Sequence, residues 1–121
     1  MITLILFTAL LLVLVLSHEA GHFFVARAFG IKVEEFGFGI PPRIWSLWRD
    51  AKGTLYSLNL LPFGGFVKIY GEEGEYRNEP RSFSSKPITT RLKVIVAGVT
   101  MNFLLAVLVF WRLLRLDYSE S

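Results

Sequence analysis

Five residues at the end of a long apolar run carry the side chains best suited to chemistry in this sequence. They read His18-Glu19-Ala20-Gly21-His22. In a helix, side chains four positions apart lie about one turn apart on the same face, so both imidazoles can reach one metal ion. Imidazole nitrogens suit Zn²⁺, and two of them can fill two of its tetrahedral positions. The pattern therefore predicts that His18 and His22 bind zinc.

The glutamate between these histidines is suited to a different task. On a helical wheel, Glu19 lies about 100° from His18, so its carboxylate can enter the same cavity without binding the metal. A carboxylate placed there can take a proton from a metal-bound water, as the general base of a metalloprotease does. We expect Glu19 to be catalytic. The alternative is that His18 and Glu19 only mark the end of a membrane anchor, but an anchor needs no second histidine in register.

The composition limits what kind of protein can carry this motif. The chain has 121 residues, 53% of them hydrophobic, and a formal net charge of +3. Such a composition is typical of a small membrane protein rather than a soluble domain. There are no cysteines, so a metal must be held by histidine and carboxylate side chains. The basic residues form no stripe or basic-aromatic pattern, so we expect no nucleic-acid partner.

Two stretches are long enough to cross a lipid bilayer, which makes the bilayer an expected partner. They run from about residue 2 to 29 and from about 88 to 116, and about 20 apolar residues suffice for a helix to span the hydrocarbon core. A cleavable signal peptide is the alternative for the first stretch, but no Lys or Arg precedes its apolar run.

The basic residues also predict the orientation. Eleven of the thirteen Lys and Arg residues lie from Arg27 to Lys93, between the uncharged cores of the two stretches, and none precedes the first. The positive-inside rule then places residues 30–90 in the cytoplasm and both termini outside. We expect a multi-pass protein of the inner (plasma) membrane.

The segment between the spans, residues 31–86, predicts a small antiparallel β-unit and a polar loop. Gly37-Phe38-Gly39 indicates an extended segment with a close backbone approach, which the following Pro41-Pro42 is expected to end. Residues 54–60 alternate between apolar and polar side chains, and residues 66–70 form the returning strand. The expected fold is therefore α-helical, with two transmembrane helices flanking a cytoplasmic antiparallel β-hairpin or sheet.

Two features suggest how a peptide could be held near the motif. The strand that begins Phe66-Val67-Lys68 has an edge that can bind an extended backbone by β-augmentation. Asn102 is an amide in an otherwise apolar span and needs a partner, either the first helix or a substrate backbone. Glu72, Glu73 and Glu75 lie in the polar loop, and we interpret them as solubilising charges.

Taken together, the motifs resemble the N-terminal part of the site-2 protease family, the intramembrane zinc metalloproteases of the RseP-like branch. The matching segments are residues 18–23, 37–39, 61–68, 84–87 and 97–102. The resemblance implies zinc at His18 and His22, Glu19 as base, and cleavage of transmembrane protein substrates within the membrane. It also implies that the following residues lie near the substrate: Gly37, Phe38, Gly39, Phe66, Val67, Lys68 and Asn102.

One departure from the family concerns the third zinc ligand. In the family this is an aspartate in a Leu-Asp-Gly motif on a later helix, which this chain lacks. Asp117 lies at the wrong end of the second span to replace it. We expect the third ligand on a missing downstream helix, with the PDZ domain and C-terminal helices also absent. The 121 residues would then be an incomplete N-terminal half, inactive in isolation.

Two other functions remain open on these residues. The first is a non-catalytic helix-binding membrane protein or pseudoprotease, which would be indifferent to Glu19→Gln. The second is another class of membrane zinc peptidase, in which a downstream glutamate supplies the third ligand.

Overall fold

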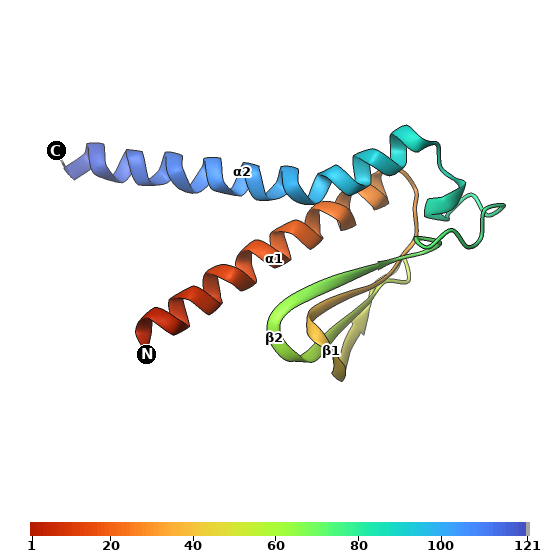
Figure 1. Ribbon diagram of the computed structural model, residues 1–121, viewed down its shortest axis with the longest axis horizontal. Coiled ribbons are helices and arrows are strands. Elements are labelled where there is room, and N and C mark those ends of the chain that lie inside the picture. Colours follow the sequence, from red (N-terminus) through yellow and green to blue (C-terminus); the bar gives the residue numbers. More distant parts are fainter. Residues whose placement is uncertain (121) are drawn as a thin grey trace.

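The computed structural model describes residues 1–120 and contains two long helices with a β-unit between them in sequence. The elements are α1 (Ile2–Ala28), β1 (Val33–Arg49), β2 (Leu55–Ile69), the short 3₁₀ helix η1 (Phe83–Ser85) and α2 (Ile88–Glu120). Figure 1 shows α1 and α2 meeting at one end and diverging toward the two chain termini, while the β-unit lies beside α1.

Both helices are long and apolar enough to cross a membrane, as expected from the sequence. Mean hydropathy over the most apolar window is 2.2 in α1 and 2.4 in α2. Most of their large side chains remain uncovered; Phe7 is 62% exposed and Phe110 is 64% exposed. Apolar surface on this scale requires a partner or a lipid environment. The second helix extends four residues beyond the expected end at 116, because no glycine or proline follows to stop it.

Small residues bring the two helices into contact. A Cβ atom added at Gly21 would overlap the carbonyl oxygen of Ala97, so the backbones of α1 and α2 touch at this point. Glycine and alanine allow such an approach between membrane helices, where close packing replaces the hydrophobic effect. The crossing point lies within the His-Glu-x-x-His motif, and it therefore fixes the motif against α2.

The β-unit is a two-stranded antiparallel sheet in which each long strand bends back on itself. The first half of β1 pairs with the end of β2, from Val33 opposite Ile69 to Phe38 opposite Gly65. The same half of β1 also pairs with residues 55–58 at the start of β2. Here the residue numbers increase in the same direction in both segments, as they do between parallel strands. It therefore lies between the two halves of β2.

The prolines do not end the first strand as the sequence suggested. Strand β1 continues through Pro41 and Pro42, which lie between the pairs Ile40–Leu61 and Arg43–Asn59. Both strands bend at this tip, and neither proline has a partner residue in the other strand. Because proline has no N–H to donate, it is tolerated at such an unpaired position. Figure 1 shows that this tip points back along α1, toward the side on which the termini lie.

The alternating strand has its polar face covered and its apolar face open. Ser57 is 0% exposed and Asn59 is 4% exposed, whereas Leu58 is 40% and Leu60 is 55% exposed. The Ser57 hydroxyl donates to Glu35 at 2.6 Å, within the covered side. In a water-soluble protein, a sheet with one open face covers its apolar side and exposes its polar side, which is the reverse of what is seen here. It suits a tip surrounded by an apolar medium.

The hydrophobic core joins the end of α1 to the β-unit and the start of α2. It consists of Phe23, Ala26, Ile31, Val33, Phe36, Ile69, Phe83 and Val94. The aromatic rings of Phe23 and Phe36 meet edge to face with centroids 5.4 Å apart, a favoured geometry. This core holds the β-unit at the end of α1 that carries the motif.

Candidate active site

His22 is held in one orientation by the second helix. Its Nδ1 atom lies 2.7 Å from the carbonyl oxygen of Val94. A carbonyl can only accept a hydrogen bond, so Nδ1 carries the proton and donates it. The other ring nitrogen, Nε2, then keeps its lone pair. Metal-binding histidines commonly use this arrangement, in which a backbone carbonyl fixes the tautomer.

His18 lies beside His22 and packs against a glycine of α2. The two imidazole rings are 4.7 Å apart between centroids and almost perpendicular, at 83°. A Cβ atom added at Gly98 would be 2.6 Å from His18 Cε1 and 2.7 Å from Nε2. Any side chain at position 98 would therefore displace the nitrogen-bearing edge of the His18 ring.

Glu19 faces the edge of β2. The backbone N–H of Val67 lies close enough to its carboxylate to favour the charged form. At Gly65 the same strand lies against the side chains of Leu16 and Val15. The last segment of β2 thus runs along α1 beside the motif, where an extended peptide would have to lie.

Glycines set the shape of the neighbouring strand. The ring of Phe66 lies directly over Gly37, and a Cβ atom at that position would overlap it. Gly39 has a φ of +89° and lies against the backbone oxygen of Leu61. Only glycine adopts this backbone conformation without cost. The structure therefore brings Gly37, Gly39 and Phe66 together, with the half-buried Phe38 between the two glycines.

Two other predicted substrate-binding residues differ in their surroundings. The ammonium of Lys68 lies 3.5 Å from Glu34 and its side chain is 66% exposed. Asn102 lies one helical turn beyond Gly98, and its buried Oδ1 atom has no hydrogen-bond partner in residues 1–120. An unpaired buried amide oxygen is costly, so this atom requires a partner that residues 1–120 do not supply.

Sequence reasoning missed Glu72, which it treated as a solubilising charge. Glu72 lies close enough to His22 and Glu19 for its charge to act on both. Loss of hydration raises the pKa of Glu72, while a backbone hydrogen bond at Ile69 lowers it. No signal in the sequence indicates this proximity, because it depends on the fold that brings the end of β2 beside Glu19.

A second missed cluster anchors the β-unit to α1. The guanidinium of Arg27 forms an ion pair with Asp50 and donates to Thr54 at 2.7 Å. Tyr56 also donates to Asp50, at 3.0 Å. Desolvation alone would raise the pKa of Asp50, but hydrogen bonds from Arg27, the Thr54 N–H and Tyr56 outweigh it and hold the pKa at about 2.

This cluster predicts an acid-sensitive attachment of the β-unit. The pKa of Asp50 is about 2 in the fold against a reference of 3.8, so its stabilising effect is complete above the reference value and is lost as the pH falls toward 2. Asp50→Asn should lower stability at pH 7 by on the order of 1 kcal/mol, after allowance for solvent screening. It should also flatten the pH dependence between about pH 5 and 2. Fluorescence of Trp48, which stacks on Tyr56 at 4.6 Å, would report both changes in detergent.

Asp117→Asn is the matched control, since Asp117 lies on the exposed far part of α2. It should keep the wild-type acid profile. An Asp50→Asn profile that coincides with wild type from pH 7 to 2 would contradict the role given to the cluster.

Comparison with known proteins shows the family of this chain. The family model described as "Peptidase family M50" matches residues 6–117. The chain belongs to peptidase family M50. A candidate zinc metalloprotease of Clostridium acetobutylicum is 42% identical over 98 residues, which is 81% of this chain and 28% of that protein.

Further M50 relatives are similar at comparable levels. A candidate zinc metalloprotease of Rickettsia conorii is 36% identical over 116 residues, covering 91% of this chain and 32% of that protein. The regulator of sigma-E protease RseP of Escherichia coli is 37% identical over 102 residues, covering 82% of this chain and 22% of that protein. The family and these names support a metalloprotease. The chain spans less than a third of the length of each of these relatives.

The names of the Clostridium and Rickettsia relatives imply zinc, and the geometry accommodates it in part. His22 offers Nε2, and His18 lies beside it, as two nitrogen ligands would. Within residues 1–120, no group of three His, Cys, Asp or Glu side chains lies close enough together to hold a metal ion. A catalytic zinc site uses three protein ligands. The described residues therefore fit two of the three.

Proposed function

We propose that this chain is the motif-bearing part of an intramembrane zinc metalloendopeptidase that cleaves transmembrane protein substrates. The observation that carries the proposal is the convergence of two oriented imidazoles and Glu19 beneath the edge of β2. All three lie on a helix apolar enough to cross a membrane. Ionisable residues in such a helix are expensive, and they usually mark function.

His18 and His22 would hold the zinc ion, with a third ligand from a helix outside these 121 residues. When bound, zinc supplies Lewis acidity that polarises the scissile carbonyl and lowers the pKa of a water molecule. Glu19 would accept the proton of the attacking water and pass it to the leaving amine nitrogen. The carbonyl of Val94 would keep His22 in one tautomer throughout, because its hydrogen bond holds the proton on Nδ1.

The β2 edge would hold the substrate as an extended strand. A transmembrane substrate arrives as a helix, whereas peptide hydrolysis requires an extended backbone. The backbone N–H of Val67 lies close to the carboxylate of Glu19 in this structure. A substrate carbonyl would replace Glu19 at that N–H, which frees the carboxylate for proton transfer at the moment when substrate is present. Asn102 Oδ1, buried and unpaired, would accept a backbone N–H of the same segment.

Membrane placement follows from the same structural features. Two apolar helices and an outward-facing apolar sheet surface at the β-unit tip support insertion of the helices and of this tip. The exposed residues at the tip include Ile40, Ile44, Trp45, Leu60, Leu61 and Phe63. With the excess of Lys and Arg between the helices, the polar loop would lie in the cytoplasm and the protein in the inner membrane.

Zinc titration tests the metal site. His22→Ala should weaken zinc binding by about 10- to 100-fold or more, since it removes a ligand, and His18→Ala should do the same. Binding can be measured by competition with a chromophoric chelator in detergent. The wild-type chain by itself should bind zinc weakly, because it supplies two ligands.

Lys32→Ala is the control for this titration. Lys32 lies ten positions after His22, and its ammonium stacks over the ring of Tyr70. It should leave zinc affinity unchanged. Equal affinity in wild type, His18→Ala and His22→Ala would refute the site and favour a helix-binding protein without catalysis.

The edge-strand step has its own test. Val67→Pro removes the N–H that the substrate carbonyl would need. Cleavage of a transmembrane substrate should therefore fall by about 10-fold or more, which corresponds to the loss of one buried hydrogen bond. Val67→Ala keeps the N–H and should retain most activity. The assay is cleavage of a fluorescent transmembrane peptide by the protein that contains this chain. Unchanged cleavage by a folded Val67→Pro variant would exclude substrate pairing at this edge.

A further inference from the structure

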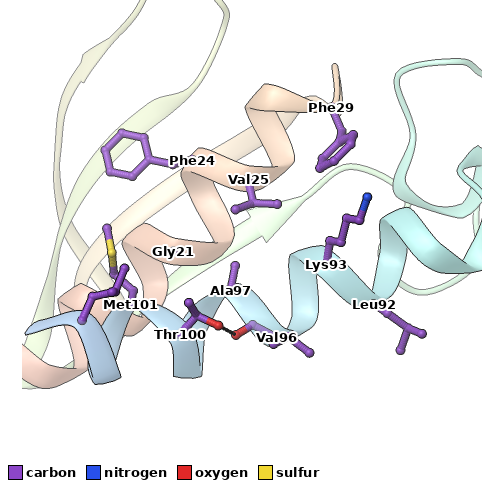
Figure 2. Close-up of a pocket in the computed structure, with 11 residues that line it drawn as sticks. Gly21, Phe24, Val25, Phe29, Leu92, Lys93, Val96, Ala97, Thr100 and Met101 are labelled. Carbon is purple, nitrogen blue, oxygen red and sulfur yellow. Dashed lines mark hydrogen bonds between the residues drawn. The ribbon is translucent and has the colours of Figure 1, made fainter.

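A long groove between α1 and α2 is not explained by the active site. Its volume is about 590 Å³, and its lining contains neither motif histidine. Figure 2 shows Phe24, Val25 and Phe29 along one wall, and Val96, Thr100 and Met101 along the other. Gly21 and Ala97, where the two backbones touch, also line it.

The groove is apolar with a cation at one end. The hydroxyl of Thr100 donates to the carbonyl of Val96 at 2.9 Å, so it is satisfied within the helix. Lys93 is the one charged residue in the lining, and its ammonium lies 5.3 Å from the centre of the Phe29 ring. In Figure 2 these two side chains face each other at the end nearest the loop. A ligand that fits must be apolar along most of its length and anionic at one end.

The length of the groove matches one leaflet of a bilayer. It extends along α2 from Lys93, near the start of the helix, to Leu104. At the helical rise this distance is about 16 Å, which is about half of a hydrocarbon core of about 30 Å. Lys93 would then lie at headgroup level and Leu104 near the bilayer centre.

A lipid fits this lining better than another helix. It combines an apolar chain with an anionic group that Lys93 attracts. Transmembrane helices also carry Lys and Arg at their cytoplasmic ends, which Lys93 would repel. A phosphate group would instead be attracted.

We propose that this groove binds one anionic phospholipid, with an acyl chain along Val96, Thr100 and Leu104 and its phosphate at Lys93. The inference rests on the membrane placement proposed above. The lipid would contact both helices at the crossing of Gly21 and Ala97, one residue from His22 and from Gly98. It would therefore brace the helix pair that orients the two imidazoles.

Native mass spectrometry of the full 121-residue chain in detergent tests the proposal. Phosphatidylglycerol, phosphatidylcholine and free glycerol 3-phosphate would be titrated separately. We expect one phosphatidylglycerol molecule to be retained, weaker binding of phosphatidylcholine, and no binding of glycerol 3-phosphate. Equal retention of the two lipids, or binding of glycerol 3-phosphate as tight as that of phosphatidylglycerol, would overturn it.

Two pairs of variants locate the site. Thr100→Phe fills the groove and should abolish retention, whereas Val99→Phe, at a position that is 64% exposed and outside the lining, should not. Lys93→Gln should weaken phosphatidylglycerol binding about five-fold, the effect of one lysine near an anionic surface. Arg77→Gln, in the exposed loop, removes an equal charge and should have no effect.

Each result bears on the lipid site separately from catalysis. Equal phosphatidylglycerol binding in Thr100→Phe and Val99→Phe would refute the site, even if Lys93→Gln failed to fold. Glu19→Gln should retain the lipid while losing proteolysis, so a failure of the proposed protease function leaves the lipid result intact.

Discussion

Replacement of Glu19 by glutamine is expected to lower proteolysis by about 10²- to 10⁴-fold, the usual contribution of a general base. Glutamine has the same shape but cannot accept a proton. Its side-chain oxygen can still lie against the Val67 N–H, as the carboxylate of Glu19 does, so the fold around the motif should persist. The measurement is cleavage of a labelled transmembrane peptide by the protein that contains this chain, together with its zinc content.

Zinc content separates this effect from loss of the metal site. Glu19 is not an expected ligand, so Glu19→Gln should keep zinc affinity near that of wild type, unlike His22→Ala. Glu75→Gln is the matched control, because Glu75 is an exposed carboxylate of the polar loop, and it should be fully active. Wild-type cleavage rates in Glu19→Gln would rule out its role as base and favour the non-catalytic interpretation.

Gly21→Val should separate the two helices and cost more than about 2 kcal/mol of stability. Overpacking a well-packed contact typically costs about 1–3 kcal/mol. Here the obstacle is the backbone carbonyl of Ala97 rather than a flexible side chain, so relief requires movement of a whole helix. That movement would also break the hydrogen bond between His22 and Val94. We expect a lower thermal transition by circular dichroism and weaker zinc binding.

Ala9→Val provides the control on the same helix. Ala9 is exposed, far from the crossing, and valine adds similar bulk there without meeting α2. Its thermal transition and zinc affinity should match wild type. If Gly21→Val behaved like Ala9→Val in both measurements, the close contact of α1 and α2 would not be what positions the imidazoles.

The local patterns predicted the helices and the motif well. A membrane helix depends on a continuous run of apolar residues, which can be read directly from the chain. The spacing of His18 and His22 placed both on one face of α1, and the structure brings their rings to 4.7 Å. The close approach of α1 and α2 at Gly21 and Ala97 needs only small side chains, which glycine and alanine supply regardless of distant sequence.

The β-unit shows where such patterns fail. Alternation in residues 54–60 indicated two faces, but not which one is covered. Ser57 and Asn59 are covered because the bent strands bring Glu35 and Phe38, about twenty residues away, over them. Likewise, Pro41 and Pro42 lie inside β1 because the tip requires no N–H donors there. Both outcomes depend on long-range pairing.

The sequence by itself determined the chemistry available to this protein: two imidazoles and a carboxylate on one face of an apolar helix. It also determined the two spans, since hydropathy and helical period act within a few turns. Only the tertiary structure decided that Val94 fixes the tautomer of His22, that Gly98 makes room for His18, and that Val67 and Glu72 lie beside Glu19. These partners are separated from the motif residues that they contact by about 50–80 positions. They meet it because helix crossing and strand bending, rather than local preference, set distances between remote residues.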